Sequence, residues 1–282
     1  MAIHIVTDSA ADFHPSEAAA LGISLVPLTV TFDGKEYKDA VELSHKEFFE
    51  KLIETDALPT TSQATPHQFE TVYSELTANG DSVVVVTISS KLSGTYQSAC
   101  IAAQDYEGKV FVVDSLSATV GERILIQTAL DYVKSGMCAE EIAARLTEDR
   151  EKVCVMALLD TLEYLKKGGR ISSAVAFAGG ILSIKPVIRV EEGAVVLAGK
   201  ARGSKNGNNL LRKLIEEVGG IDFSRHLCIV YSGLNDDMLQ KYIEDSEDLW
   251  NGQIDNLPIA TIGAVIGTHI GPGAVGIAFF RK

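Results

Sequence analysis

The chain has 282 residues, of which 46% are hydrophobic and 22% are charged, and its formal net charge is −13. This composition excludes collagen-like and disordered classes. A surface this acidic also argues against nucleic-acid binding, because phosphate backbones repel it. A chain of this length is expected to form one large or two medium domains whose core needs no disulfide or metal.

The start of the chain predicts that the protein stays in the cytoplasm. Residues 1–6 contain no basic region and run directly into a strand-like segment, so we expect no signal peptide. No apolar run approaches the roughly 18 residues that a membrane span needs. The cysteines are scattered, without C-x-x-C spacing or neighbouring histidines, which predicts free thiols and no metal site.

Strand-like and helix-like segments alternate through the first half of the chain. Strands are predicted at 3–7, 24–32, 82–88 and 109–113, and helices at 46–53, 66–80, 95–104, 122–134 and 139–151. Two helix starts carry capping boxes, Ser44 with Glu47 and Thr65 with Gln68. The alternation predicts an α/β domain at residues 1–155, with a parallel sheet flanked by helices.

Beyond about residue 155 the pattern changes to α+β. A short helix is expected to begin near Asp160 and Glu163, and a Gly/Ala/Ser-rich stretch follows as far as Gly180. Next come a hairpin at 186–190 and 194–197, helices at 208–218 and 237–247, and strands at 227–231 and 274–280. This predicts a second domain at residues 156–282 with a largely antiparallel sheet, packed closely on the first.

Polar residues follow the predicted parallel strands, where open α/β sheets bind ligands. Asp8 and Asp114 are better explained as caps of the segments that follow them. Ser93 is predicted to be the N-cap of the helix at 95–104. Together with the bare amide of Gly94, its hydroxyl suits a phosphate or a carboxylate.

Two further stretches are candidates for contact with an oxygen-rich ligand. Thr60, Thr61 and Ser62 are adjacent hydroxyls, although an ordinary turn explains them equally well. His269 is expected in a tight glycine loop, either structural or aimed at a ligand. Two basic islands, Lys166-Lys167-Arg170 and Lys200-Arg202-Lys205, serve solubility and helix dipoles or else contact an anionic partner.

Taken in order, these segments resemble the bacterial DegV family, which includes the fatty-acid-binding, FakB-type subunit of fatty acid kinase. The motifs are IVTDS at 5–9, TSQ at 61–63, SSxLSGTY at 89–96, VDS at 113–115, KGGRIS at 167–172, IKP at 184–186 and HxGPG at 269–273. Each motif is weak alone, but seven in the family's order are specific.

The resemblance implies two α/β domains that enclose the tail of a long-chain fatty acid such as palmitate, with no cofactor. It implies that Thr61, Ser62, Ser93 and Gly94 hold the carboxylate, with His269 in the same hydrogen-bond network. Arg170 matches a surface arginine that meets a separate ATP-binding kinase subunit of the FakA type, which makes the acyl phosphate. Transient contact with a membrane is a further expectation.

Two segments depart from the family pattern, and one alternative function stays open. Gly121-Glu122-Arg123 and the loop 200–209 put pocket shape and partner identity in question.

The alternative function is that of a hydrolase or phosphotransfer enzyme that uses Ser93 as nucleophile and His269 as base. Asp8 or Asp114 would then orient the base, and the Gly94 N–H would form an oxyanion hole.

Overall fold

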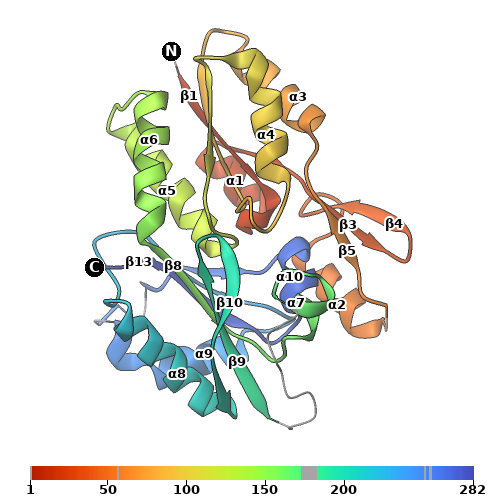
Figure 1. Ribbon diagram of the computed structural model, residues 1–282, viewed down its shortest axis with the longest axis vertical. Helices are drawn as coiled ribbons and strands as arrows, with labels where there is room; N and C mark the ends of the chain where they lie inside the picture. The colour runs from red at the N-terminus through yellow and green to blue at the C-terminus, as the bar shows by residue number, and fades with distance from the viewer. Residues whose placement is uncertain (1, 56, 173–182, 251, 254–255) are drawn as a thin grey trace.

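The computed structural model describes residues 2–55, 57–172, 183–250, 252–253 and 256–282. Its strands form sheets of four, six and three strands, and Figure 1 shows the helices around them. The Gly/Ala/Ser-rich stretch predicted up to Gly180 lies, from residue 173 on, outside the described residues.

The first sheet is parallel throughout, as the alternating pattern predicts. Its strands, in spatial order, are β2 (Ile23–Val26), β1 (Ile3–Asp8), β6 (Ser82–Thr87) and β7 (Val110–Asp114). Around it lie α1 (Pro15–Leu21), α3 (Pro66–Thr77), α4 (Thr95–Ala103), α5 (Val120–Lys134) and α6 (Ala139–Asp149). Figure 1 shows α3 and α4 on one side of this sheet and α5 and α6 on the other. Because helices cover both faces, the valines of β6 are completely buried.

The second sheet is mixed and mostly antiparallel. Its order is β10 (Ala194–Arg202), β9 (Ile184–Glu191), β8 (Val153–Leu158), β13 (Val275–Phe280), β11 (Leu227–Tyr231) and β12 (Ile259–Thr261), with only the last pair parallel. The helices α8 (Ser204–Glu217) and α9 (Asp237–Asp245) share a hydrophobic core with one of its faces. The domain boundary predicted after residue 155 falls inside β8, and the division into two domains stays a prediction.

The single strand predicted at 24–32 is wrong. It is two strands in different sheets, because Pro27 has no N–H for a ladder and interrupts the pairing. After this proline the chain continues as β3 (Thr29–Phe32), which pairs antiparallel with β4 (Lys35–Lys38) and β5 (Thr60–Ser62). The helix α2 (His45–Glu54) follows, with the predicted capping box of Ser44 and Glu47 in place.

The glycine loop predicted around His269 is also wrong, because this residue lies in the last turn of a helix, α10 (Ala264–Ile270). The helix is buried almost all round, so its one glycine, Gly267, serves packing instead of turning. A side chain at Gly267 would place Cβ 2.5 Å from the Phe48 ring. The chain leaves the helix at Gly271, whose φ is +71°.

In the part of the chain that the structure describes, no helix is both long and apolar enough to cross a bilayer. The four cysteines are free thiols. The described residues contain no group of His, Cys, Asp or Glu side chains arranged to hold a metal ion.

Candidate functional site

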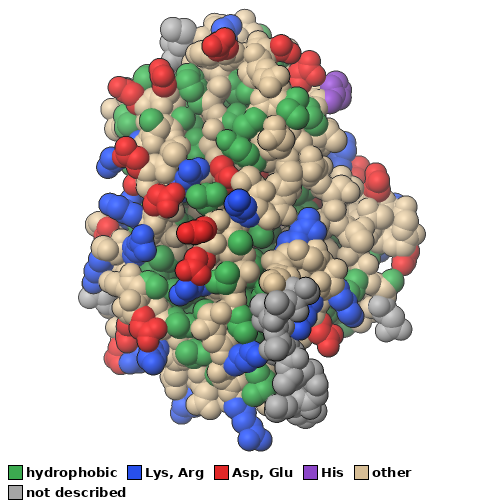
Figure 2. Space-filling view, in the orientation of Figure 1, with side chains coloured by type: hydrophobic (Ala, Val, Ile, Leu, Met, Phe, Trp, Pro, Cys, Tyr) green, Lys and Arg blue, Asp and Glu red, His purple; other side chains and the backbone are tan. Residues whose placement is uncertain are grey.

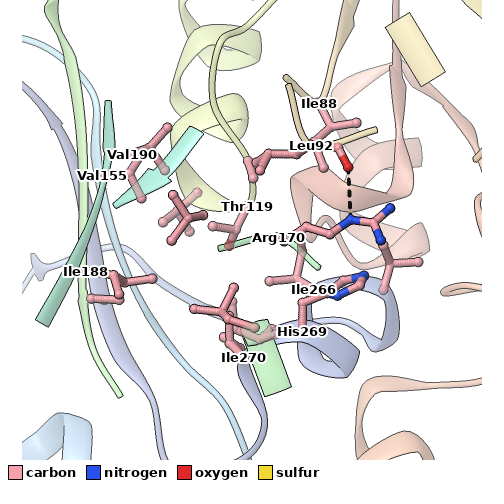
Figure 3. Close-up of a pocket in the computed structure, with 18 of the residues that line it drawn as sticks. Ile88, Leu92, Thr119, Val155, Arg170, Ile188, Val190, Ile266, His269 and Ile270 are labelled. Carbon is pink, nitrogen blue, oxygen red and sulfur yellow. Dashed lines mark hydrogen bonds between the residues drawn. The ribbon is translucent and has the colours of Figure 1, made fainter. Parts of the chain in front are cut away.

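A cavity of about 350 Å³ lies between the two large sheets and is lined mostly by apolar side chains. Figure 3 shows His269 and Arg170 at one end of it and Val155, Ile188 and Val190 at the other. Strands of the six-stranded sheet and the helix α10 supply many of the apolar side chains, and most of the polar groups lie at the His269 end, with Arg189 on the wall at the other. Such a cavity suits an elongated molecule with a single polar head.

His269 presents a neutral imidazole to the cavity. Its Nε2 lies 2.9 Å from Thr61 Oγ1 on β5, which forms a hydrogen bond. Its Nδ1 is buried and has no hydrogen-bond partner among the described residues. Burial and the nearby charge of Arg170 lower the pKa of His269 to about 4. At neutral pH the ring can therefore donate or accept one hydrogen bond without carrying charge.

The absence of a side chain at Gly168 leaves room for the imidazole ring of His269. This glycine follows the short helix α7 (Glu163–Lys167) and lies directly against the imidazole. A side chain at this position would place Cβ 2.2 Å from His269 Nδ1. The KGGRIS motif thus contributes a contact surface as well as its charges.

The prediction that Ser93 is the N-cap of α4 is wrong, because Gly94 occupies that position. The Ser93 hydroxyl accepts a 3.3 Å bond from the Thr95 N–H and lies 2.9 Å from Thr95 Oγ1. It therefore lies one residue before the N-cap, on the wall of the cavity.

Gly94 allows β5 to approach α4 closely. A Cβ at this glycine would lie 2.0 Å from Gln63 Oε1, and Gln63 Nε2 donates a 2.9 Å bond to Ser98 Oγ. This contact brings Thr61 and Ser62 to the same end of the cavity as Ser93. Sequence reasoning did not select Gln63, although the TSQ motif contains it.

Arg170 lines the cavity beside His269, whereas the resemblance implies a surface position. The residue is half-buried. Its Nε donates to the carbonyl of Leu92 at 3.2 Å, and its Nη1 donates to the carbonyl of Gly168 at 2.7 Å. The guanidinium thus ties the segment before Ser93 to the end of α7 and brings a positive charge to the polar end (Figure 3).

The predicted capping roles of Asp8 and Asp114 match their contacts. Asp8 accepts bonds from the Ala10 N–H (2.9 Å) and the Ile88 N–H (2.8 Å). Asp114 Oδ1 accepts bonds from the N–H groups of residues 90 and 116. Neither carboxylate is hydrogen-bonded to His269, and the Ser93 hydroxyl contacts Thr95, so the catalytic triad of the alternative function is not assembled.

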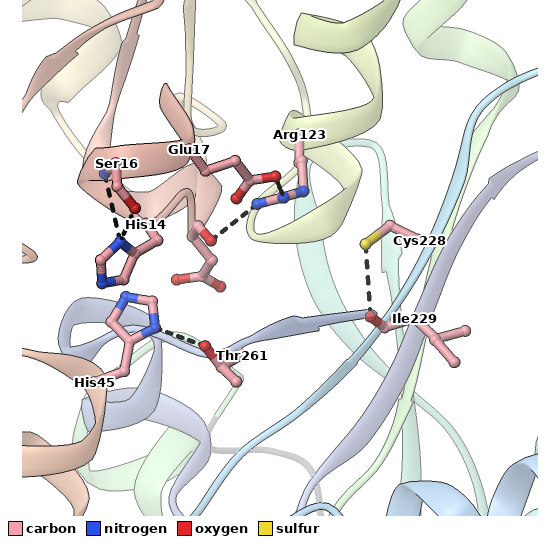
Figure 4. Close-up of polar contacts among 9 residues, drawn as sticks. His14, Ser16, Glu17, His45, Arg123, Cys228, Ile229 and Thr261 are labelled. Carbon is pink, nitrogen blue, oxygen red and sulfur yellow. Dashed lines mark hydrogen bonds and ion pairs between the residues drawn. The ribbon is translucent and has the colours of Figure 1, made fainter. Parts of the chain in front are cut away.

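The departure at Gly121-Glu122-Arg123 lies outside the cavity lining. Glu122 is completely buried and accepts a 2.9 Å bond from Thr7 Oγ1, and burial raises its pKa well above the usual range. Arg123 is paired with Glu17, as Figure 4 shows, and its guanidinium lies 4.1 Å from the Phe13 ring centre. Both residues are therefore buried, and neither lines the cavity.

The departure at 200–209 forms the end of β10 and the start of α8. Gly203, with φ of +77°, makes the turn between them. Figure 2 shows Lys and Arg side chains around α7 and the lower ends of β9 and β10, where the two basic islands fall.

The fold is that of an α/β protein that encloses a largely apolar cavity with a cluster of polar groups at one end. The chain belongs to the DegV family: the model described as "Uncharacterised protein, DegV family" matches residues 2–282. A DegV domain-containing protein of Deinococcus radiodurans is 36% identical, over 99% of this chain and 98% of its own.

Two solved structures show the same fold. A DegV family protein from Thermus thermophilus, described by its fatty acid binding, has 37% identity and a TM-score of 0.89 over 100% of both chains. A stearic acid-binding protein from Eubacterium ventriosum has 27% identity and a TM-score of 0.85, over 100% of this chain and 99% of that one.

Proposed function

We propose that this protein binds one long-chain fatty acid, with the carboxylate at the His269 end of the cavity and the alkyl tail between the two sheets. The observation that carries the proposal is the cavity itself, which is lined mostly by apolar side chains and has a cluster of polar groups at the His269 end. The fatty-acid ligands of similar DegV structures support the same chemistry.

The carboxylate is held by hydrogen bonds from Thr61, Ser62, Ser93 and the Gly94 amide, with His269 as a neutral partner. Hydrogen bonds to a charged group are worth about 1.5–3 kcal/mol each, so several of them offset the desolvation of one carboxylate. The charge of Arg170 lies beside these groups and stabilises negative charge on the ligand.

The alkyl tail supplies most of the affinity. Burial of an alkyl chain the length of palmitate contributes roughly 10 kcal/mol before the loss of translational and rotational freedom, at about 0.8 kcal/mol per methylene. The net result is an affinity on the order of micromolar or tighter.

The protein then presents the carboxylate of the bound fatty acid to a separate, ATP-binding kinase subunit in the cytoplasm, and that subunit forms the acyl phosphate. The position of Arg170 at the polar end supports this step, since an arginine there stabilises the charge of an incoming phosphoryl group. The basic islands on an otherwise acidic chain favour contact with an anionic surface of the kinase or, transiently, of a membrane.

The test is native mass spectrometry of the protein purified from a bacterial host, followed by denaturation to identify the released lipid. We expect one fatty acid per chain, and reloading of delipidated protein by palmitate. A delipidated, folded protein that takes up no saturated or unsaturated long-chain acid at about micromolar concentration would overturn the proposal. Acyl phosphate formed without a second subunit would overturn the presenting role.

A further inference from the structure

The strands β8 and β9 separate before they end. Their ladder stops at the pair Met156–Arg189, although β8 begins at Val153 and β9 continues to Glu191. Beyond that pair, β8 remains paired with β13, and β9 remains paired with β10. The six-stranded sheet therefore has an opening between two of its central strands.

This opening lies at the apolar end of the fatty-acid cavity. Val155, Met156, Arg189 and Val190 line that cavity and also a second cavity of about 460 Å³. Figure 3 shows Val155 and Val190 at the end opposite His269. The far end of the first cavity therefore borders the second.

The second cavity contains unused hydrogen-bond donors. Arg150, Arg189 and Arg281 line it, together with Ser117. The buried Nε of Arg189 and the Ser117 hydroxyl have no hydrogen-bond partner among the described residues, and the buried Nε of Arg150 has only an ion pair of 3.5 Å with Glu151. Arg281 donates from Nη2 to the backbone carbonyl of Glu151. Buried donors without partners favour a ligand group that accepts hydrogen bonds.

Acidic side chains at the rim make a free anion a poor occupant. The Glu191 carboxylate accepts bonds of 2.9 and 3.0 Å from Arg189 Nη2, and a Glu151 carboxylate oxygen lies 3.5 Å from Arg150 Nε. Glu192 also lines the cavity, so its formal charges balance. An acceptor carried on a tail already bound in the first cavity needs no long-range attraction, because its effective concentration is high.

We propose that the protein accepts long-chain acids whose ω-end carries a hydrogen-bond acceptor, α,ω-dicarboxylic acids being the simplest. One carboxylate lies at the His269 end, the tail passes between Val155 and Val190, and the second carboxylate reaches the donors of the second cavity. This inference rests on the proposed binding of fatty acids.

The first test compares palmitate with hexadecanedioic acid and its shorter and longer homologues on the delipidated protein. We expect the best diacid to bind within about tenfold of palmitate. If the apolar end of the cavity is closed instead, the second carboxylate of the diacid is buried without a partner. The diacid should then bind more than about 1000-fold more weakly than palmitate. That result, with palmitate bound normally, overturns this inference alone; loss of palmitate binding overturns the proposed function.

A pair of variants tests the second carboxylate. Arg281→Met should weaken diacid binding about tenfold through loss of a charge-assisted hydrogen bond, and should leave palmitate binding unchanged. Arg145→Met on α6, which lines neither cavity, is the matched control and should change neither affinity. Equal diacid affinity in both variants overturns the placement of the second carboxylate.

Alkylation of cysteines gives a readout that does not depend on affinity. Cys154 lines the second cavity, whereas Cys138 is exposed before α6 and serves as an internal control. At saturation the diacid should slow modification of Cys154, and palmitate should not. Equal protection by a short dicarboxylate such as succinate would identify a free-anion site and overturn delivery by the tail.

Discussion

The polar end of the cavity is built from the ends of elements, whereas the apolar end is built from strands in a sheet. Thr61 lies on a three-residue strand and Ser93 precedes a helix. His269 lies in the last turn of a helix, and Arg170 follows one. Val155 and Ile188, in contrast, lie on β8 and β9. Loops and element ends bring backbone and side-chain donors together, and a sheet provides a smooth apolar wall.

The orientation of the ligand and the affinity for it are therefore separately adjustable. Each polar group at the His269 end contributes one hydrogen bond or one charge, and the strands contribute area. We therefore expect substitutions on the strands to change which tails are bound, and substitutions at the polar end to change how the carboxylate is held.

The largest effect is expected from filling the apolar end. Ala157 lies on β8 and lines the cavity, so Ala157→Phe should displace about five methylenes and weaken palmitate binding by about 4 kcal/mol, or about 1000-fold. Titration with palmitate and octanoate checks this result. Octanoate should still bind, and an equal loss of both acids would show that the substitution damages the site as a whole.

The next effect concerns the charge at the polar end. Arg170→Gln removes a guanidinium that donates to two carbonyls and lies beside the carboxylate site, and should weaken palmitate binding about 30-fold. Arg145→Gln is the exposed control. Parallel assays of binding and of phosphorylation with added kinase subunit and ATP separate two roles. Unchanged affinity with lost phosphorylation would place Arg170 in the kinase encounter alone.

A smaller effect is expected for a single neutral hydroxyl. Ser93→Ala removes one hydrogen bond to the carboxylate and should weaken palmitate binding about tenfold while the tail keeps the ligand bound. Ser90→Ala, at an exposed neighbouring position, should leave the affinity unchanged. If Ser93→Ala matches the wild type in both binding and phosphorylation, the hydroxyl only supports the first turn of α4.

The smallest effect on binding is expected at the opposite end of α10, where Asp12 accepts a 2.8 Å bond from the Gly263 N–H. Burial raises the pKa of Asp12 to about 8, from about 3.9 in an unfolded chain. Between these values the folded protein keeps a proton that the unfolded chain has released. The contribution of this group to the free energy of unfolding therefore falls as pH rises, by up to about 1.4 kcal/mol per pH unit.

Asp12→Asn keeps an acceptor and cannot titrate, and Asn tolerates the positive φ of this position, 55°. The stability of the wild type relative to this variant should therefore decline from pH 5 to pH 8 in denaturant titrations, with palmitate affinity nearly unchanged. A difference in stability that does not vary with pH would show that Asp12 is ionised in the folded protein.

Most of the fold could be read from the pattern of the chain. The capping boxes at Ser44 and Thr65 mark helix starts that the structure contains, and the buried runs of β1 and β6 predict a parallel sheet. The sequence does not show the break at Pro27, because the two flanking strands are both rich in β-branched and apolar residues and look like one run. The helix around His269 was missed because glycines that serve packing look like turn signals.

The types of most elements, the acidic net charge and the hydroxyl-bearing segments follow from the amino-acid sequence, because they depend on local periodicity, capping and charge. The family resemblance placed Thr61 and His269 in one hydrogen-bond network, but their direct contact and the entry of Arg170 into the same cavity became visible in the folded structure alone. The tertiary structure also decided where β8 and β9 part. Such contacts depend on side-chain packing across the two sheets, on which local periodicity carries no information.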